Sequence, residues 1–87
     1  MQSKVLKIEN ETGLHARPAT ELAKIAMKYP CDIKLIANGK TFDAKSPLMI
    51  MSAGIKQRTE IEIKCNGEKE EEAINEIEEA FKNNFGE

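Results

Sequence analysis

Residues 32–43, Asp-Ile-Lys-Leu-Ile-Ala-Asn-Gly-Lys-Thr-Phe-Asp, predict a β-hairpin. Ile33, Leu35 and Ala37 fall on one face of a strand over residues 32–37, because successive side chains of a strand point to opposite faces. Asn38-Gly39 tolerates the positive φ angles of a tight type I′ turn, and residues 40–43 form the return strand. Strands joined by so short a turn are antiparallel, so we expect an antiparallel sheet.

Two other stretches show the same alternation of apolar and polar residues. Residues 3–9 place Leu6 and Ile8 on one face, and residues 59–65 place Ile61 and Ile63 on one face. Each pattern is typical of a strand with one buried face. The sequence therefore predicts four strands in all.

Three segments have helical spacing or helix-start signals. Apolar residues three and four apart predict a helix from Ala16 to Lys28, which Tyr29-Pro30 ends. Ser46 can cap a short helix that begins at Pro47. A last helix over residues 69–84 has a stripe of apolar residues and begins in a run of glutamates that we expect to be solvated. The order of elements indicates an α+β fold, an antiparallel sheet covered on one side by helices.

The length and charge of the chain restrict its class. The 87 residues are expected to form one domain over residues 1–87, and a net charge of -2 argues against general binding of nucleic acid. We find no signal-peptide pattern and no apolar run long enough to span a membrane, and we expect a cytoplasmic location. Cys31 and Cys65 fit no metal-binding pattern, so we expect two small apolar core residues and no metal site.

The only histidine, His15, directly precedes the predicted first helix. The amides of a helix's first turn and its dipole attract anions. Arg17 adds a permanent charge and a fork of donors that matches phosphate, while Pro18 removes no helical hydrogen bond at this place. Gly13 gives the entering loop freedom to turn. An imidazole nitrogen can attack phosphorus, so the segment suits a phosphoryl group that is held transiently.

Considered alone, these residues favour a plainer interpretation, in which His15 is a surface residue at a helix start and Arg17 is merely exposed. The chain also lacks a Gly-x-x-x-x-Gly-Lys nucleotide loop, a second histidine and an obvious carboxylate cluster for magnesium. A phosphoryl carrier of this kind would need partner enzymes to supply the donor. We expect no cofactor.

The stretch Gly-Leu-His-Ala-Arg-Pro-Ala over residues 13–19 resembles the signature of the HPr family. These are the histidine-containing phosphocarriers of the bacterial phosphoenolpyruvate:sugar phosphotransferase system. The resemblance covers the whole chain, including Asn38-Gly39-Lys40, Lys45-Ser46 and residues 51–54. It implies an open-faced β-sandwich, in which three helices cover one side of a four-stranded antiparallel sheet in the order βαββαβα.

The resemblance also implies a phosphoryl carrier and not an enzyme. His15 would accept a phosphoryl group from enzyme I and pass it to the EIIA component of a sugar permease, and Arg17 would steady that group. Ser46 matches the family's regulatory serine, which HPr kinase/phosphorylase modifies and whose phosphorylated form binds a catabolite-repressor protein. Pro47 and Met49 depart from the family pattern around this serine, so the alternative is a plain N-cap serine.

The short helix that follows Ser46 holds more large apolar residues than two turns can bury. We expect Ile50, and secondarily Met51, to enter the core, while the others form an apolar patch beside His15. Methionines suit a surface that must fit several partners. The residues expected to bind partners are Thr20, Lys24, Pro47, Leu48, Met49 and Met51, with Lys28 as a further flanking residue. We expect a monomer.

The sequence is also compatible with two other functions. One is a family member that acts mainly in regulation, as a corepressor or in a regulatory phosphotransfer chain. The other is an interaction module without phosphotransfer, in which His15 is only a helix cap.

Overall fold

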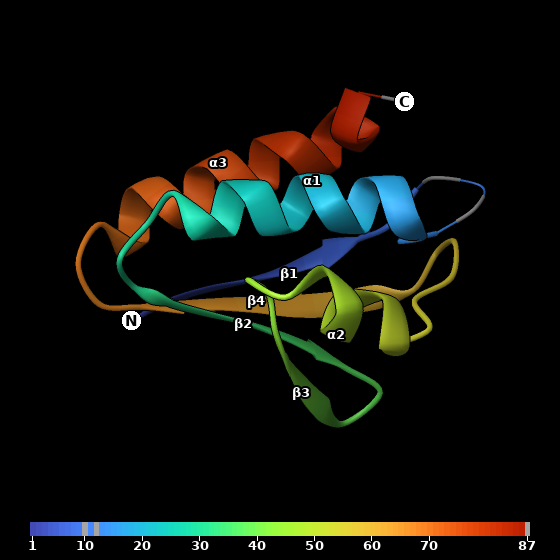
Figure 1. Cartoon of the computed structure of the whole chain (residues 1–87), viewed down its shortest axis with the longest axis horizontal. Coiled ribbons are helices and arrows are strands. Elements are labelled where there is room, and N and C mark those ends of the chain that lie inside the picture. The colour runs from blue at the N-terminus through green and yellow to red at the C-terminus, as the bar shows by residue number, and fades with distance from the viewer. Residues whose placement is uncertain (10, 12, 87) are drawn as a thin grey trace.

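The computed structural model describes residues 1–9, 11 and 13–86. These residues form a four-stranded antiparallel sheet of β1 (Gln2–Lys7), β2 (Asp32–Ala37), β3 (Lys40–Asp43) and β4 (Glu60–Asn66). The strand order is β1-β4-β2-β3, so β4 lies between the first two strands of the chain (Figure 1). The predicted antiparallel sheet is confirmed.

Within this described part of the chain there are three α-helices, α1 (Ala16–Met27), α2 (Pro47–Ser52) and α3 (Glu70–Lys82), followed by a short 3-10 helix, η1 (Asn84–Gly86). Figure 1 shows α1 and α3 side by side over one face of the sheet. The shorter α2 packs against α1 and β3. The predicted α+β fold, with three helices and an open-faced sheet, is confirmed.

The hairpin follows its local sequence. Leu35 pairs with Phe42 and Ala37 with Lys40, and the two turn residues, Asn38 and Gly39, have φ angles of 54° and 77°. Both angles are positive, as a type I′ turn requires. The predicted bounds of β2 and β3 are correct at both ends.

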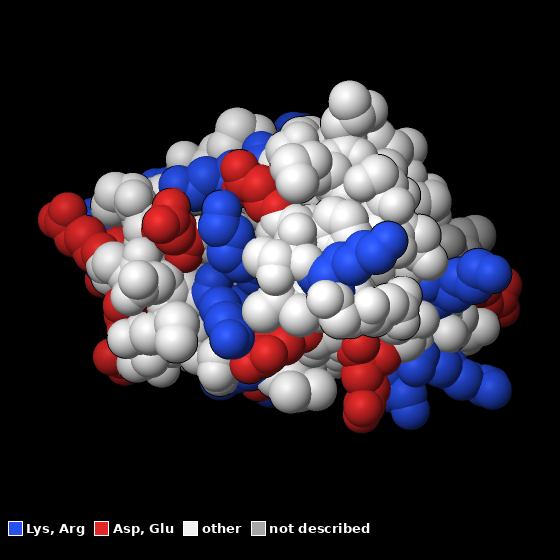
Figure 2. Space-filling view, turned by 90° about the horizontal axis from the view of Figure 1, so that it is seen from below, with Lys and Arg blue, Asp and Glu red and all other residues white. Residues whose placement is uncertain are grey.

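One face of the sheet and the facing sides of the helices make the core. The strands contribute Ile33, Leu35, Ala37, Ile61, Ile63 and Cys65, and the helices contribute Ala19, Leu22, Ala23, Ala26, Ile50, Ala73, Ile74, Ile77 and Phe81. Figure 2 shows the opposite side of the molecule, where basic and acidic side chains are interspersed. No single sign of charge dominates that face.

Several predicted ends were wrong. The first strand ends at Lys7 and not at residue 9, although Ile8 is still buried, and the fourth strand lies one residue later than predicted. The last helix ends at Lys82. Asn84 and Phe85 then adopt left-handed φ angles of 51° and 54°, and the ring of Phe85 contacts that of Phe81 edge-on at 4.9 Å between centroids. Phe85 is buried as predicted, but in η1 and not in a continuous helix.

Both cysteines are buried free thiols, as expected from the absence of a metal-binding pattern. Burial raises the pKa of the Cys65 thiol to about 11, which favours the neutral form that an apolar environment accepts. Cys31 and Cys65 therefore act as core residues at the ends of neighbouring strands.

A polar network joins the two long helices at the end where α1 stops. Lys28 and the hydroxyl of Tyr29 both donate to the carboxylate of Glu76 in α3. Lys45 donates its ammonium to the carbonyl oxygen of Tyr29 over 2.9 Å. This network fixes the C-terminal end of α1 to α3 and to the segment that precedes α2.

The glutamates at the start of α3 are not all solvated. Glu68, Glu71 and Glu72 are exposed, as expected, but Glu70 is half-buried. It accepts the amide of Gly67 over 2.9 Å and lies 2.9 Å from the amino group of Met1. These two contacts lower the pKa of the Glu70 carboxyl, so this residue closes the turn between β4 and α3.

Among the described residues, no helix combines the length and apolar character needed to cross a bilayer.

Candidate functional site

His15 occupies the N-cap position of α1 and is exposed. Its backbone is extended, with φ -83° and ψ -164°, and its carbonyl oxygen accepts the first helical hydrogen bond from Ala19 over 2.9 Å. The imidazole does not cap the helix by a hydrogen bond to the first-turn amides. The interpretation of His15 as a side-chain cap therefore has no support in this geometry, and the ring lies at the surface where a partner can reach it.

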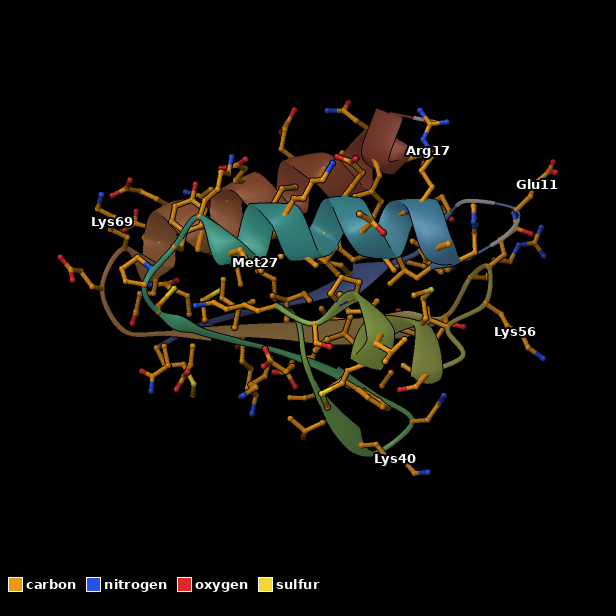
Figure 3. All side chains as sticks on the ribbon, in the orientation of Figure 1. Glu11, Arg17, Met27, Lys40, Lys56 and Lys69 are labelled. Atoms are coloured by element: carbon orange, nitrogen blue, oxygen red, sulfur yellow. The ribbon has the colours of Figure 1, made fainter. Side chains whose placement is uncertain are left out.

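Arg17 and Pro18 lie in the first turn of α1 but have different environments. Pro18 is buried, where its fixed φ angle suits the helix and its missing amide costs no helical hydrogen bond. Arg17 is exposed, and Figure 3 shows its side chain extending from α1 away from the sheet. The first turn of α1 thus buries Pro18 and exposes the guanidinium of Arg17, two residues after His15.

The chain that enters His15 rests on the segment that follows α2. The amide of Leu14 donates to the carbonyl oxygen of Ile55 over 3.0 Å. Gly13 has a φ angle of 67°, and a Cβ atom there would lie 2.2 Å from the same carbonyl oxygen. Gly13 has the positive φ angle that its predicted freedom to turn allows, and the close contact with Ile55 is a second reason for glycine that the sequence did not indicate.

Ser46 is the N-cap of α2, as predicted. Its hydroxyl oxygen accepts the amide of Met49 over 3.3 Å, its carbonyl oxygen accepts the amide of Ile50 over 3.1 Å, and Pro47 holds the first helical position. The serine side chain is half-buried. Its hydroxyl is thus engaged in starting the helix.

The apolar residues of α2 divide between core and surface. Ile50 enters the core as expected, and Met51 joins the surface residues expected to bind partners, so the alternative that placed it in the core was wrong. Ile50 is fully buried, whereas Leu48, Met49 and Met51 are 75%, 41% and 37% exposed. We call these three exposed side chains the α2 patch. Because α2 packs against α1, the α2 patch adjoins the helix that His15 begins, and Figure 2 shows a broad area without charged side chains on that side.

Of the residues expected to flank this patch, two lie along α1 on its exposed or partly exposed side. Thr20 is half-buried and donates its hydroxyl to the carbonyl oxygen of Ala16 over 2.7 Å. Lys24 is exposed, with its ammonium 3.6 Å from the carboxylate of Glu21. Lys28, at the C-terminal end of α1, contacts Glu76 of α3, and its role as a flanking residue stays a prediction.

A cavity of about 220 Å³ lies away from His15, between β1 and α3, and is lined by Val5, Leu6, Lys7, Glu9, Glu78, Phe81 and Lys82. In the described part of the chain, no group of three or more His, Cys, Asp or Glu residues is placed to hold a metal ion. An exposed histidine two residues from an exposed arginine, with the α2 patch on a helix that packs against α1, is suited to binding another protein.

The sequence did not predict the contacts that Ile55 and Tyr29 make. Ile55 contributes a backbone oxygen, and any residue has one, so nothing in the sequence marks it. Tyr29 bonds to a side chain 47 positions away, a pairing that helical spacing cannot reveal.

Comparison with known proteins connects this geometry to one family. Residues 2–83 match the family model described as the phosphotransferase-system HPr component phosphorylation site. The solved structure of a histidine-tagged HPr from Thermoanaerobacter tengcongensis superposes with a TM-score of 0.96 at 37% identity, covering 100% of this chain and 98% of that chain. The crystal structure of an HPr dimer from the same organism is also similar, with a TM-score of 0.80.

Two further structures are similar. The phosphocarrier protein HPr of Bacillus anthracis has a TM-score of 0.87 at 32% identity, with 92% of this chain and 95% of that chain covered. Crh, a catabolite-repression protein of Bacillus subtilis described as an intertwined dimer with domain swapping, has a TM-score of 0.72 at 33% identity. That comparison covers 93% of this chain and 91% of Crh.

Proposed function

This chain belongs to the HPr family of phosphotransferase-system phosphocarriers, and from that membership we propose that His15 accepts a phosphoryl group from enzyme I and passes it to EIIA components of sugar permeases. The observation that carries the proposal is the family match over residues 2–83 together with an exposed imidazole at the start of α1. The family is one of carriers, so turnover resides in the partners.

The chemistry at His15 is a single transfer. A neutral ring nitrogen attacks phosphorus, the bond from phosphorus to the donor atom breaks, and the donor keeps that electron pair. The phosphorylated ring then loses the proton from its other nitrogen to water or to the donor. Passing the group to EIIA reverses these steps, so one protein can both receive and give.

Arg17 and the first turn of α1 stabilise the transferred group in this proposal. The phosphoryl oxygens are anionic, and the helix start supplies amides without helical partners and the positive end of the dipole. The exposed guanidinium of Arg17 can turn toward those oxygens and offer two parallel donors.

The α2 patch, with Pro47, Thr20 and Lys24, is the proposed docking surface for enzyme I and EIIA. The patch supplies apolar contact area and adaptable methionine side chains, while Lys24 offers a positive charge to an acidic partner. Docking on α2 would bring the partner's reactive group to the adjoining start of α1.

Ser46 is a proposed regulatory site. A phosphate there would lie at the start of α2, where the helix dipole favours negative charge, and it would place that charge at the edge of the docking surface. Modification by HPr kinase/phosphorylase would then weaken docking of acidic partners and favour binding to a catabolite-repressor protein.

The similarity to Crh favours one second candidate, a family member that serves mainly in catabolite repression. A similar HPr and Crh are described as dimers, and size-exclusion chromatography with light scattering tests the expected monomer against a dimer. Family membership supports a cytoplasmic location, where the donor and acceptor proteins of this chain of transfers would meet.

Incubation with purified enzyme I and labelled phosphoenolpyruvate tests the proposal. We expect acid-labile, alkali-stable label on His15, which EIIA then removes. His15→Ala should keep its melting temperature and take no label, and Arg17→Lys should take label faster than Arg17→Ala because it keeps the charge. An unlabelled wild-type chain would contradict the carrier function and leave the regulatory or interaction roles.

Leu48→Ser tests the docking surface. It should raise the KM for enzyme I, since Leu48 is 75% exposed on the α2 patch. Val5→Ser is the matched control, because Val5 is also largely exposed but lies on β1. Equal KM values for the two variants would contradict docking at α2.

A further inference from the structure

The segment of residues 54–59 lies beside the chain that leads into His15. The carbonyl oxygen of Ile55 accepts the amide of Leu14 over 3.0 Å. The backbone of Gly13 is so close that an added Cβ would lie 2.2 Å from that oxygen and 2.8 Å from the Cα of Lys56. Figure 1 shows these two parts of the chain meeting at one end of the molecule.

The same segment also contacts the chain on the other side of the loop. Arg58 donates its amide to the carbonyl oxygen of Ile8 over 2.7 Å, and Ile8 donates to that of Thr59 over 3.1 Å, which continues the pairing of β1 with β4. The side-chain amide of Gln57 donates to the carbonyl oxygen of Glu9 over 3.3 Å. Glu9 and Leu14 are therefore both hydrogen-bonded to residues of the same segment.

The segment is itself anchored. The side chain of Ile55 is buried in the core, and the amide of Gly54 donates to the carbonyl oxygen of Met51 over 3.2 Å, so the segment continues directly from α2. Arg58 has a φ angle of 68°, a left-handed conformation that costs free energy in any residue with a side chain. The surrounding hydrogen bonds compensate for that cost.

We propose that Ile55 and Gln57 are positioning residues for His15. Ile55 holds the backbone of Leu14 through its carbonyl oxygen, and Gln57 holds the far side of the loop at Glu9. The inference deepens the proposed function and rests on it. Transfer between two proteins requires the ring nitrogen, phosphorus and donor atom to align, and small misplacements slow such reactions strongly.

The same segment also links the position of His15 to that of the α2 patch. Since only Ala53 separates Gly54 from α2 and Ile55 contacts Leu14, one continuous stretch of backbone places both His15 and the docking surface. For a partner bound to α2, the imidazole of His15 therefore lies at a fixed position. Figure 3 shows Lys56, within this segment, at the same end of the molecule as Arg17.

Two pairs of variants test the positioning role. Gln57→Met keeps the length of the side chain and removes the donor, whereas Gln57→Lys restores a donor. Ile55→Val trims a buried side chain beside the contact to Leu14, and Ile77→Val trims an equally buried isoleucine of α3 as the control for lost stability. The readouts are phosphoryl transfer from enzyme I and hydrogen exchange of the Leu14 amide.

Gln57→Met loses one hydrogen bond, and Ile55→Val loosens the packing that holds the Ile55 carbonyl oxygen against Leu14. For both we expect transfer at saturating enzyme I to slow about threefold to tenfold, with KM nearly unchanged. The Leu14 amide should exchange faster in both. Gln57→Lys and Ile77→Val should stay near the wild-type rate of transfer.

Unchanged Leu14 exchange in both Gln57→Met and Ile55→Val would overturn the proposal. Faster exchange without slower transfer would overturn it as well, because the segment would then hold the loop without affecting His15. If the wild-type chain accepts no phosphate, the proposed function fails, and the exchange data still decide whether these residues hold the loop.

Discussion

The carbonyl oxygen of Ile55 lies 2.2 Å from the position that a Cβ atom would take on Gly13. Two segments that are far apart in the sequence are thus packed backbone against backbone just before His15. Such an approach is open only to glycine, since any side chain would push the two segments apart.

Gly13→Ala should therefore destabilise the protein by about 2 kcal/mol or more, from the left-handed φ angle and the displaced backbone together. Gly39→Ala is the matched control, because Gly39 has a φ angle of 77° and no atom within 4 Å of an added Cβ. It should cost only about 1 kcal/mol. Urea unfolding measures both, and equal losses would contradict the close contact at Ile55.

The hairpin and the start of α1 could be predicted because their signals are local. Asn38-Gly39 alone predicts the turn type, and Pro18 indicates the first turn of a helix. Ser46 and Pro47 likewise identify the start of α2 without reference to the rest of the chain.

Features that depend on distant contacts could not be predicted in this way. The end of α3 is one example, because Phe85 keeps the apolar spacing of a continuing helix although Asn84 and Phe85 adopt left-handed φ angles. The exposure of Met51 depends on how α2 packs against α1 and β3, which its own sequence does not state. The contact between Leu14 and Ile55 uses backbone atoms that every residue has.

Ser46→Ala should destabilise the protein by about 1 kcal/mol, the usual cost of losing an N-cap side chain. The reason is that the Ser46 hydroxyl accepts the amide of Met49 at the start of α2. Ser46→Asn should recover most of this loss, since asparagine caps helices well. Urea unfolding provides the measurement, and equal stability of the alanine and asparagine variants would argue against the cap.

Acid should weaken the fold through the carboxylates that bind cations. Lys28 and Tyr29 lower the pKa of Glu76, and Lys4 lowers that of Glu78. A carboxyl whose pKa is lower in the folded state stabilises the fold above its unfolded value, near 4.5, and loses this effect as pH falls through the folded value. The free energy of unfolding should therefore decline below about pH 4.5, and less steeply in Glu76→Gln. A wild-type slope in Glu76→Gln would contradict the role of this carboxylate.

Alkali should reveal the hydrogen bond between Tyr29 and Glu76. Donation to the Glu76 carboxylate, followed by burial and the charges of Glu76 and Glu72, raises the pKa of Tyr29 from 10.0 to about 12. A raised pKa means that this contact stabilises the fold fully below pH 10 and loses that effect as pH rises toward 12. The chain has one tyrosine and no tryptophan, so phenolate absorbance reports Tyr29 alone. The midpoint should move toward the ordinary value in Glu76→Gln, and a wild-type midpoint near 10 in a chain that circular dichroism shows to be folded would contradict the bond.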